Sequence, residues 1–235
     1  MKDFFDGILA VFIFLFPVAV VIFTLRKLIK IPDELFRKIL HFILLAAYIP
    51  FLFGFIEWWH CVIFIVGFAI VLFPLLTALR KIPGFSRFVN ERKNGEFASS
   101  MLLALGVMAG SITVGWGLMS DKYIVLAGVY AWGVGDAFAA LIGKRFGKHK
   151  ITWRFVDNKK SVEGTLAMVI TSAISVFTVL VIRGGVSPLW CALISLVVAS
   201  ASAFVELCTK NGYDTVTCPL VSMLLLLPMI TLLGG

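Results

Sequence analysis

The sequence predicts an all-α protein embedded in a membrane as a polytopic bundle of about eight transmembrane helices. Hydrophobic residues make up 60% of the chain and the mean hydropathy is +1.03, so too little polar surface is left to cover a water-soluble globule. The apolar runs are continuous and about 20 residues long, which suits helices that cross a hydrocarbon core roughly 30 Å thick. Strands of a closed barrel, the other structure that lipid allows, would alternate apolar and polar residues.

Short and long connections alternate along the chain. Glu57 alone, and the segment from Ser120 to Lys122, separate neighbouring runs tightly. We expect the first run to remain as a helix, because Lys2 is followed by Asp3 and Asp6 and does not form the basic start of a signal peptide. The chain shows no repeat or linker, so residues 1–235 are interpreted as one membrane domain. The expected helices lie at 4–25, 38–56, 58–79, 98–119, 123–143, 163–183, 187–205 and 217–234, and the longer polar connections at 26–37, 80–97, 144–162 and 206–216.

Positive charge lies almost entirely on one side of this predicted topology. Of the 21 Lys and Arg residues, 18 lie in or beside the connections that follow the first, third, fifth and seventh runs. Only Lys2, Lys122 and Arg183 lie on the other side. Because cytoplasmic loops carry the excess of Lys and Arg, we expect both termini outside and the long loops in the cytoplasm.

The net charge of +8 does not indicate nucleic-acid binding, and the four cysteines do not indicate a metal site. The basic residues lie where the topology requires them, beside anionic lipid headgroups, so we expect contacts with headgroups and no nucleic-acid binding. Cys61, Cys191, Cys208 and Cys218 show no CxxC or metal-binding spacing, and we interpret them as small apolar side chains. Function must therefore come from polar residues at membrane depth.

Asp136 is the most informative of these polar residues. It lies nine residues before Arg145, about 13 Å along a helix, which places it below the cytoplasmic interface. Gly133 and Gly135 precede it, and such small residues let either a neighbouring helix or a ligand approach the backbone closely. A carboxylate at this depth is costly and is usually kept for a function. We predict that Asp136 is catalytic and binds Mg²⁺ or another divalent cation, which takes one or two carboxylates together with substrate phosphates.

A second polar cluster opens the sixth run, after the most basic loop. Ser161 can cap this helix, and a helix start offers free N–H groups and a positive dipole to anions. Lys160, Ser161 and Gly164 therefore suit a phosphate, although a capped helix with a collar of lysines is an alternative. That alternative does not explain Glu163 in the same turn, which could hold a second metal or take a proton from an attacking hydroxyl.

Two further groups face the same side of the membrane. Arg37 and His41 share a face at the start of the second run, with Lys38 beside them, and together they suit a phosphate. Lys38 is alternatively a simple topology determinant. Glu96 directly precedes the fourth run, where it is either an ordinary acidic helix start or a catalytic residue.

The predicted reaction class follows from where these clusters lie. Glu206 and Asp214 bracket the seventh connection, where the charge rule does not predict two acids. Every cluster lies on the predicted cytoplasmic side, which offers nucleoside triphosphates. Carboxylates for a metal, cations and helix starts for phosphates, and access to lipid favour phosphoryl or nucleotidyl transfer to a membrane-embedded substrate. The sequence contains no GxxxxGK[ST], HRD or DFG motif, so the site is not that of a P-loop enzyme or protein kinase.

These residues resemble the CTP-dependent lipid-alcohol kinases, which comprise dolichol kinase, phytol kinase and CTP-dependent diacylglycerol kinase and are distant relatives of phosphatidate cytidylyltransferase. The resemblance extends from Arg37 to Pro219. It departs from the family's Asp-Asn-x-x-x-Pro pattern at Thr215, where Asn is expected. The motifs that carry it are Arg37-Lys38 with His41, Gly135-Asp136-Ala137, Gly143-Lys-Arg-Phe-Gly147, Lys160-Ser-Val-Glu-Gly164, and Glu206 with Asp214 to Pro219.

The resemblance implies CTP as phosphoryl donor, a divalent metal, and a long-chain lipid alcohol as acceptor. An acceptor hydroxyl that enters from the bilayer would attack the γ-phosphorus in line, with Glu163 or Glu96 as base. The expected metal ligands are Asp136, Glu163, Asp214 and Glu206. The expected phosphate-binding residues are Arg37, Lys38, His41, Gly143, Lys144, Arg145, Lys160, Ser161 and Gly164.

Two other functions remain open from the sequence. In a cytidylyltransferase, a lipid phosphate would attack the α-phosphorus of CTP and give a CDP-lipid and pyrophosphate. In a small cation or proton-coupled transporter, Asp136 would be the ion site, but the sequence shows neither inverted repeats nor paired broken helices. Polyprenols, phytol-like alcohols and diacylglycerol all fit as acceptors of a kinase.

Overall fold

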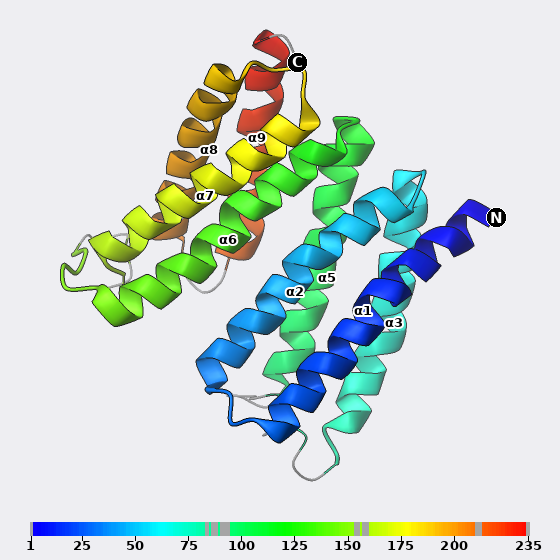
Figure 1. Ribbon diagram of the computed structural model, residues 1–235. Coiled ribbons are helices and arrows are strands. Elements are labelled where there is room, and N and C mark those ends of the chain that lie inside the picture. The colour runs from blue at the N-terminus through cyan, green and yellow to red at the C-terminus, as the bar shows by residue number, and fades with distance from the viewer. Residues whose placement is uncertain are drawn as a thin grey trace. The chain divides into compact units, whose positions relative to one another are not determined.

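The computed structural model describes residues 2–82, 85, 89, 95–152, 156, 160–209 and 213–233. Within these ranges eight helices are long and apolar enough to cross a membrane, which confirms the predicted fold class of a multi-pass helical membrane protein (Figure 1). The helices are α1 (Lys2–Leu28), α2 (Asp33–Gly54), α3 (Trp58–Leu79), α5 (Glu96–Ile112), which continues as the π-helix η1 (Thr113–Leu118), α6 (Lys122–Phe146), α7 (Val162–Arg183), α8 (Pro188–Cys208) and α9 (Asp214–Leu232).

The helix ends extend beyond several of the predicted apolar runs. Helix α2 begins at Asp33, five residues before the predicted start, and α6 continues to Phe146, three residues past the predicted end. Hydropathy marks the part of a helix that lies in hydrocarbon, whereas the helix itself continues through the polar interface. As a consequence, Lys144 and Arg145 lie in the last turn of α6 and not in a loop.

The chain divides into two compact units, residues 1–113 and 114–235, with the boundary at the junction between α5 and η1. The first unit contains α1, α2, α3 and α5, in which α1 packs against α2 and α3 packs against α5. The second unit contains η1 and helices α6 to α9. That residues 1–235 act as one membrane domain stays a prediction.

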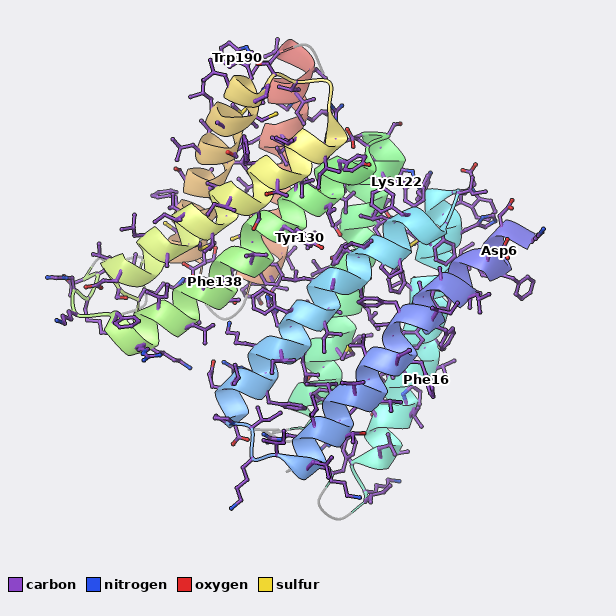
Figure 2. The ribbon with its side chains drawn as sticks, in the orientation of Figure 1. Asp6, Phe16, Lys122, Tyr130, Phe138 and Trp190 are labelled. Atoms are coloured by element: carbon purple, nitrogen blue, oxygen red, sulfur yellow. The ribbon has the colours of Figure 1, made fainter. Side chains whose placement is uncertain are left out.

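Both units present apolar side chains on their outer faces, as helices surrounded by lipid require. Phe16 of α1 and Trp190 of α8 project outward (Figure 2). The turn from α1 to α2 is closed by Arg26, which lies 2.5 Å from the Asp33 carboxylate and 4.6 Å from the centre of the Phe36 ring. The charge of Arg26 is thus paired where α1 turns into α2.

Helix α6 is the central element of the second unit. In its most apolar window 61% of the residues are buried, against 33–39% for α7, α8 and α9, and it packs on all three of them. A Cβ atom on Gly135 would come within 2.8 Å of Met168 Cγ on α7, and one on Gly128 within 2.6 Å of Met223 Cγ on α9. Close helix packing therefore explains Gly135, the residue directly before Asp136.

Candidate active site

A cleft of about 450 Å³ opens in the second unit, where the last turns of α6 meet the first turn of α7 and the end of α8. This volume lies within the range of ligand sites, roughly 300–1,000 Å³. Seven of the predicted site residues line the cleft together, which the sequence alone places only on a common side of the membrane. They are Asp136, Gly143, Lys144, Lys160, Ser161, Gly164 and Glu206.

The α6 wall of the cleft follows the helical period. Asp136, Ala139, Ala140 and Gly143 stand at i, i+3, i+4 and i+7, so they share one face of the helix, and all four line the cleft. Three of these side chains are a methyl group or smaller, which leaves space beside the Asp136 carboxylate. Asp136 itself is half-buried.

The opposite wall is the start of α7, which is capped as predicted. The Ser161 hydroxyl accepts a hydrogen bond from the backbone N–H of Gly164 at 3.2 Å, and Ser161 has the extended backbone of an N-cap residue. A Cβ atom on Gly164 would lie 2.9 Å from the carbonyl oxygen of Ala139, and one on Gly143 would lie 3.2 Å from the Ser161 hydroxyl. The two glycines are thus required for α7 to approach α6, and their part in phosphate binding stays a prediction.

A short pairing of extended backbone closes one side of the cleft. Lys150 and Ser161 form an antiparallel bridge, in which the Ile151 N–H donates to the Lys160 carbonyl at 3.1 Å and the Val162 N–H donates to the His149 carbonyl at 3.0 Å. Lys150 therefore reaches the cleft, although sequence reasoning missed it. Its spacing in the basic loop gives no signal that separates it from the exposed Lys148.

An ion pair crosses the cleft between α7 and α8. The Lys160 ammonium lies 2.7 Å from the Glu206 carboxylate and also donates to the Glu206 carbonyl oxygen. Their side chains are 22% and 12% exposed, so the pair is largely shielded from solvent. Asp136 lines the same cleft, so two carboxylates and their negative charge border it. Lys160 balances part of this negative charge.

Asp214 is held by a side chain that sequence reasoning did not single out. The indole N–H of Trp132 donates to the Asp214 carboxylate at 3.2 Å, which ties the start of α9 to α6. Trp132 lies one turn before Asp136 on the same helix. This hydrogen bond orients the Asp214 carboxylate, which does not itself line the cleft.

The predicted metal ligands are only partly brought together. Within the described residues, no group of three or more His, Cys, Asp and Glu side chains is arranged to hold a metal ion. Asp136 and Glu206 line the same cleft, whereas Glu163 and Asp214 do not belong to the described lining. Two carboxylates nevertheless fit Mg²⁺, which commonly takes one or two of them and completes its shell with phosphate oxygens and water.

Other predicted residues lie outside this cleft. The Arg145 guanidinium lies 5.3 Å from the centre of the Phe146 ring and does not line the described cleft. Glu163 turns its carboxylate to the backbone of residues 148 and 149. The roles that the sequence indicates for Arg145 as a phosphate ligand and for Glu163 as a metal ligand or base stay predictions.

Four predicted residues belong to the first unit. Arg37, Lys38 and His41 lie on α2, where Arg37 pairs with Glu34 at 2.7 Å. Glu96 begins α5, and its side chain lies outside the described residues. The roles in phosphate binding and catalysis that the sequence indicates for these residues stay predictions.

Comparison with known proteins adds a partial match. A segment of 56 residues is 48% identical to the dolichol kinase of Schizosaccharomyces pombe, and this segment covers 24% of the chain and 10% of that kinase. The match thus extends over about a tenth of the length of the curated relative. No family model and no solved structure matches the chain.

Proposed function

We propose that the protein is a CTP-dependent lipid-alcohol kinase, which transfers the γ-phosphate of CTP to the hydroxyl of a lipid alcohol and gives a lipid monophosphate and CDP. The observation that carries this proposal is the cleft in which two carboxylates, three lysines and a capped helix start converge in a membrane-spanning unit. Partial similarity to a dolichol kinase supports phosphate transfer to a lipid alcohol.

The basic groups of the cleft suit the triphosphate. Lys144, Lys150 and Lys160 would neutralise phosphate oxygens, and the start of α7 adds free N–H groups and the positive end of the helix dipole. When the nucleotide binds, the Lys160 ammonium would exchange its partner, from the Glu206 carboxylate to a phosphate. Its positive charge would stay paired with a negative group throughout.

The acidic groups suit a divalent cation. Asp136 and Glu206 would hold Mg²⁺ together with the triphosphate, because both line the cleft and Mg²⁺ uses few carboxylates. When bound, Mg²⁺ supplies positive charge beside the phosphate oxygens as the phosphoryl group is transferred. Asp136 carries most of this role in our proposal, since Glu206 is also the partner of Lys160.

The acceptor would reach the cleft from lipid. Val162 and Leu166 on the first turns of α7, and Phe138 on α6, are exposed apolar side chains next to residues that line the cleft. A hydroxyl at the end of a lipid chain can therefore arrive laterally while its chain stays among apolar side chains. It would then attack the γ-phosphorus in line, so that positioning and charge neutralisation supply the catalysis.

We place the cleft on the cytoplasmic side, where CTP is available, with both termini outside. The asymmetry of positive charge supports this orientation. Arg183 is one of only three basic residues on the other side, and its charge is offset by Asp121 at 2.6 Å, so the asymmetry in net charge is larger still. A cysteine introduced at Lys148 should react with an impermeant thiol reagent in inside-out vesicles and not in intact cells. Reaction in intact cells would reverse the orientation.

The decisive test follows the label of CTP in the purified protein. Incubation with Mg²⁺, a panel of lipid alcohols and lipid phosphates in detergent, and γ-labelled CTP should give a labelled lipid phosphate, whereas α-labelled CTP should label CDP and no lipid. Label from the α-position in a CDP-lipid, formed from a lipid phosphate with release of pyrophosphate, would replace the kinase with a cytidylyltransferase. Failure to label any lipid from either position would reject both transfer reactions.

A further inference from the structure

The Glu163 carboxylate lies against the backbone of the segment that follows α6. It accepts hydrogen bonds from the N–H groups of Lys148 and His149, both at 3.1 Å, and lies 2.7 Å from Nδ1 of the His149 ring. Its side chain is 26% exposed. These contacts join the first turn of α7 to a segment that begins at the end of α6.

The same segment is also held by the extended pairing. Residues 149 and 151 exchange backbone hydrogen bonds with Val162 and Lys160, and the bridge sets Lys150 opposite Ser161. Lys150 is therefore carried by a backbone that is hydrogen-bonded at the residues before and after it, and its side chain lines the cleft. Glu163 lies one residue beyond Val162 and completes this arrangement.

Contacts with the segment occupy much of what the Glu163 carboxylate can accept. A carboxylate offers about four lone-pair sites, and the contacts to two N–H groups and an imidazole fall mainly on Oε1. Binding a metal through that oxygen would require the segment to be released. Glu163 also does not belong to the described lining of the cleft, so the geometry favours a role that acts through other residues.

We propose that Glu163 is a positioning residue, whose carboxylate fixes the 147–151 segment and so holds Lys150 at the cleft to contact the phosphates of the nucleotide. This role differs from the metal-binding or proton-accepting role that the sequence indicates. The contact of Lys150 with phosphate rests on the proposed function, whereas the fixing of the segment by Glu163 does not.

The first arm of the test needs no catalysis. Hydrogen exchange of the Lys148 and His149 amides is measured in the full-length protein and in the Glu163→Ala and Glu163→Gln variants. Loss of a charged acceptor should speed exchange at these amides on the order of 10-fold or more in Glu163→Ala and less in Glu163→Gln, which keeps a neutral acceptor. The Tyr123 amide, which Asp121 caps at 2.8 Å, serves as the internal control and should not change. Unchanged exchange at both segment amides would overturn the proposal.

The second arm separates positioning from metal binding by kinetics with CTP. Glu163→Gln and Lys150→Ala should each raise KM for CTP, by roughly 10-fold for Lys150→Ala, with little change in kcat and in the Mg²⁺ concentration for half-maximal rate. The double variant Glu163→Ala/Lys150→Ala should be no worse than Glu163→Ala alone, because both changes remove the same contact. A rise in the Mg²⁺ requirement of Glu163→Gln, or full additivity in the double variant, would overturn the positioning role.

The two arms also separate this proposal from the proposed function. Wild-type protein that transfers no phosphate from CTP would reject the kinase, while faster exchange in Glu163→Ala would still support the fixing of the segment. Normal CTP kinase activity with unchanged exchange and unchanged KM in the Glu163 variants would reject the positioning role and leave the kinase intact.

Discussion

The two ends of the α6–α7 pair differ in how they treat charge. At the end where α6 begins, Asp121 accepts hydrogen bonds from the backbone of Tyr123 and Ile124 and pairs with Arg183 at 2.6 Å. Arg183 also donates to the Gly184 carbonyl at 3.0 Å. This end is closed, because a single carboxylate caps one helix and binds the last residue of the other.

At the opposite end, charged side chains surround a space. Asp136 and Glu206 line the cleft together with three lysines, and the Lys160–Glu206 pair crosses it. Closed pairing serves the fold, whereas the charged side chains of this end line a cleft large enough for a ligand. A charged residue near a membrane boundary therefore indicates function when small neighbouring residues leave space beside it. Ala139, Ala140 and Gly143 leave such space beside Asp136.

The largest effect is expected for Asp136→Asn at the open end. The amide keeps the size and hydrogen bonding of the carboxylate but loses the charge that would hold the metal, so turnover should fall on the order of 100-fold or more. Folding should persist, because a neutral amide is cheaper to bury than a carboxylate. Phosphate transfer from γ-labelled CTP and thermal unfolding in detergent measure the two properties. Ordinary turnover in this variant would remove Asp136 from the mechanism.

The next effect is expected for Lys160→Ala. Loss of one charge-assisted contact, about 1.5–3 kcal/mol, should raise KM for CTP or lower turnover by roughly 10- to 100-fold. Binding of the lipid acceptor should change little, because the acceptor enters through the bilayer. Lys148→Ala, which removes an exposed lysine of the same polar region, is the matched control and should stay near wild type. Equal effects of the two changes would show that Lys160 is one of the interfacial lysines and does not bind the phosphates.

A smaller effect, on stability, is expected for Gly164→Ala. The new Cβ atom would lie 2.9 Å from the backbone carbonyl of Ala139, so α7 must move away from α6 at a cost of about 1–3 kcal/mol. Gly106→Ala is the control, because nothing lies within 4 Å of a Cβ atom there, and alanine in a helix interior is favoured by up to about 1 kcal/mol. Thermal midpoints of the two variants should shift in opposite directions. A stable Gly164→Ala variant would contradict the close approach.

The smallest effect on activity is expected for Asp121→Asn at the closed end. Asparagine still caps α6 but loses the ion pair with Arg183, which is largely shielded from solvent, and we expect a loss of about 1–3 kcal/mol in the free energy of unfolding. Turnover of CTP should stay within about twofold of wild type, since this pair has no part in phosphate binding. Thermal unfolding and the transfer assay measure the two effects. A fall in turnover as large as that of Asp136→Asn would erase the distinction between the two ends.

Much of the fold could be predicted because membrane spans are local properties of the sequence. Eight spans follow from apolar runs, and the Ser161 cap follows from residue type at a helix start. The convergence of Asp136, Lys160 and Glu206 could be predicted only as a common side of the membrane. Their assembly in one cleft depends on which helices pack together.

The remaining features of the site depend on long-range pairing that hydropathy does not encode. Lys160 and Glu206 are separated by 46 residues in the chain, and Trp132 and Asp214 by 82. Glu163 illustrates a different limit. Its place in the first turn of α7 could be predicted, but the direction of its carboxylate is decided by the backbone of the neighbouring segment. Residue spacing therefore predicts on which side of the membrane a side chain lies, and packing decides which side chains line the cleft.

The most direct test of the central claim asks whether the nucleotide occupies this cleft. Lys150→Cys and Lys148→Cys are prepared in a Cys208→Ser background, since Cys61, Cys191 and Cys218 are buried, and each is treated with a thiol reagent with and without Mg²⁺ and CTP. We predict that Mg²⁺ and CTP slow the labelling of Lys150→Cys strongly and leave that of Lys148→Cys unchanged. Equal labelling rates of Lys150→Cys with and without saturating CTP would contradict nucleotide binding in the cleft.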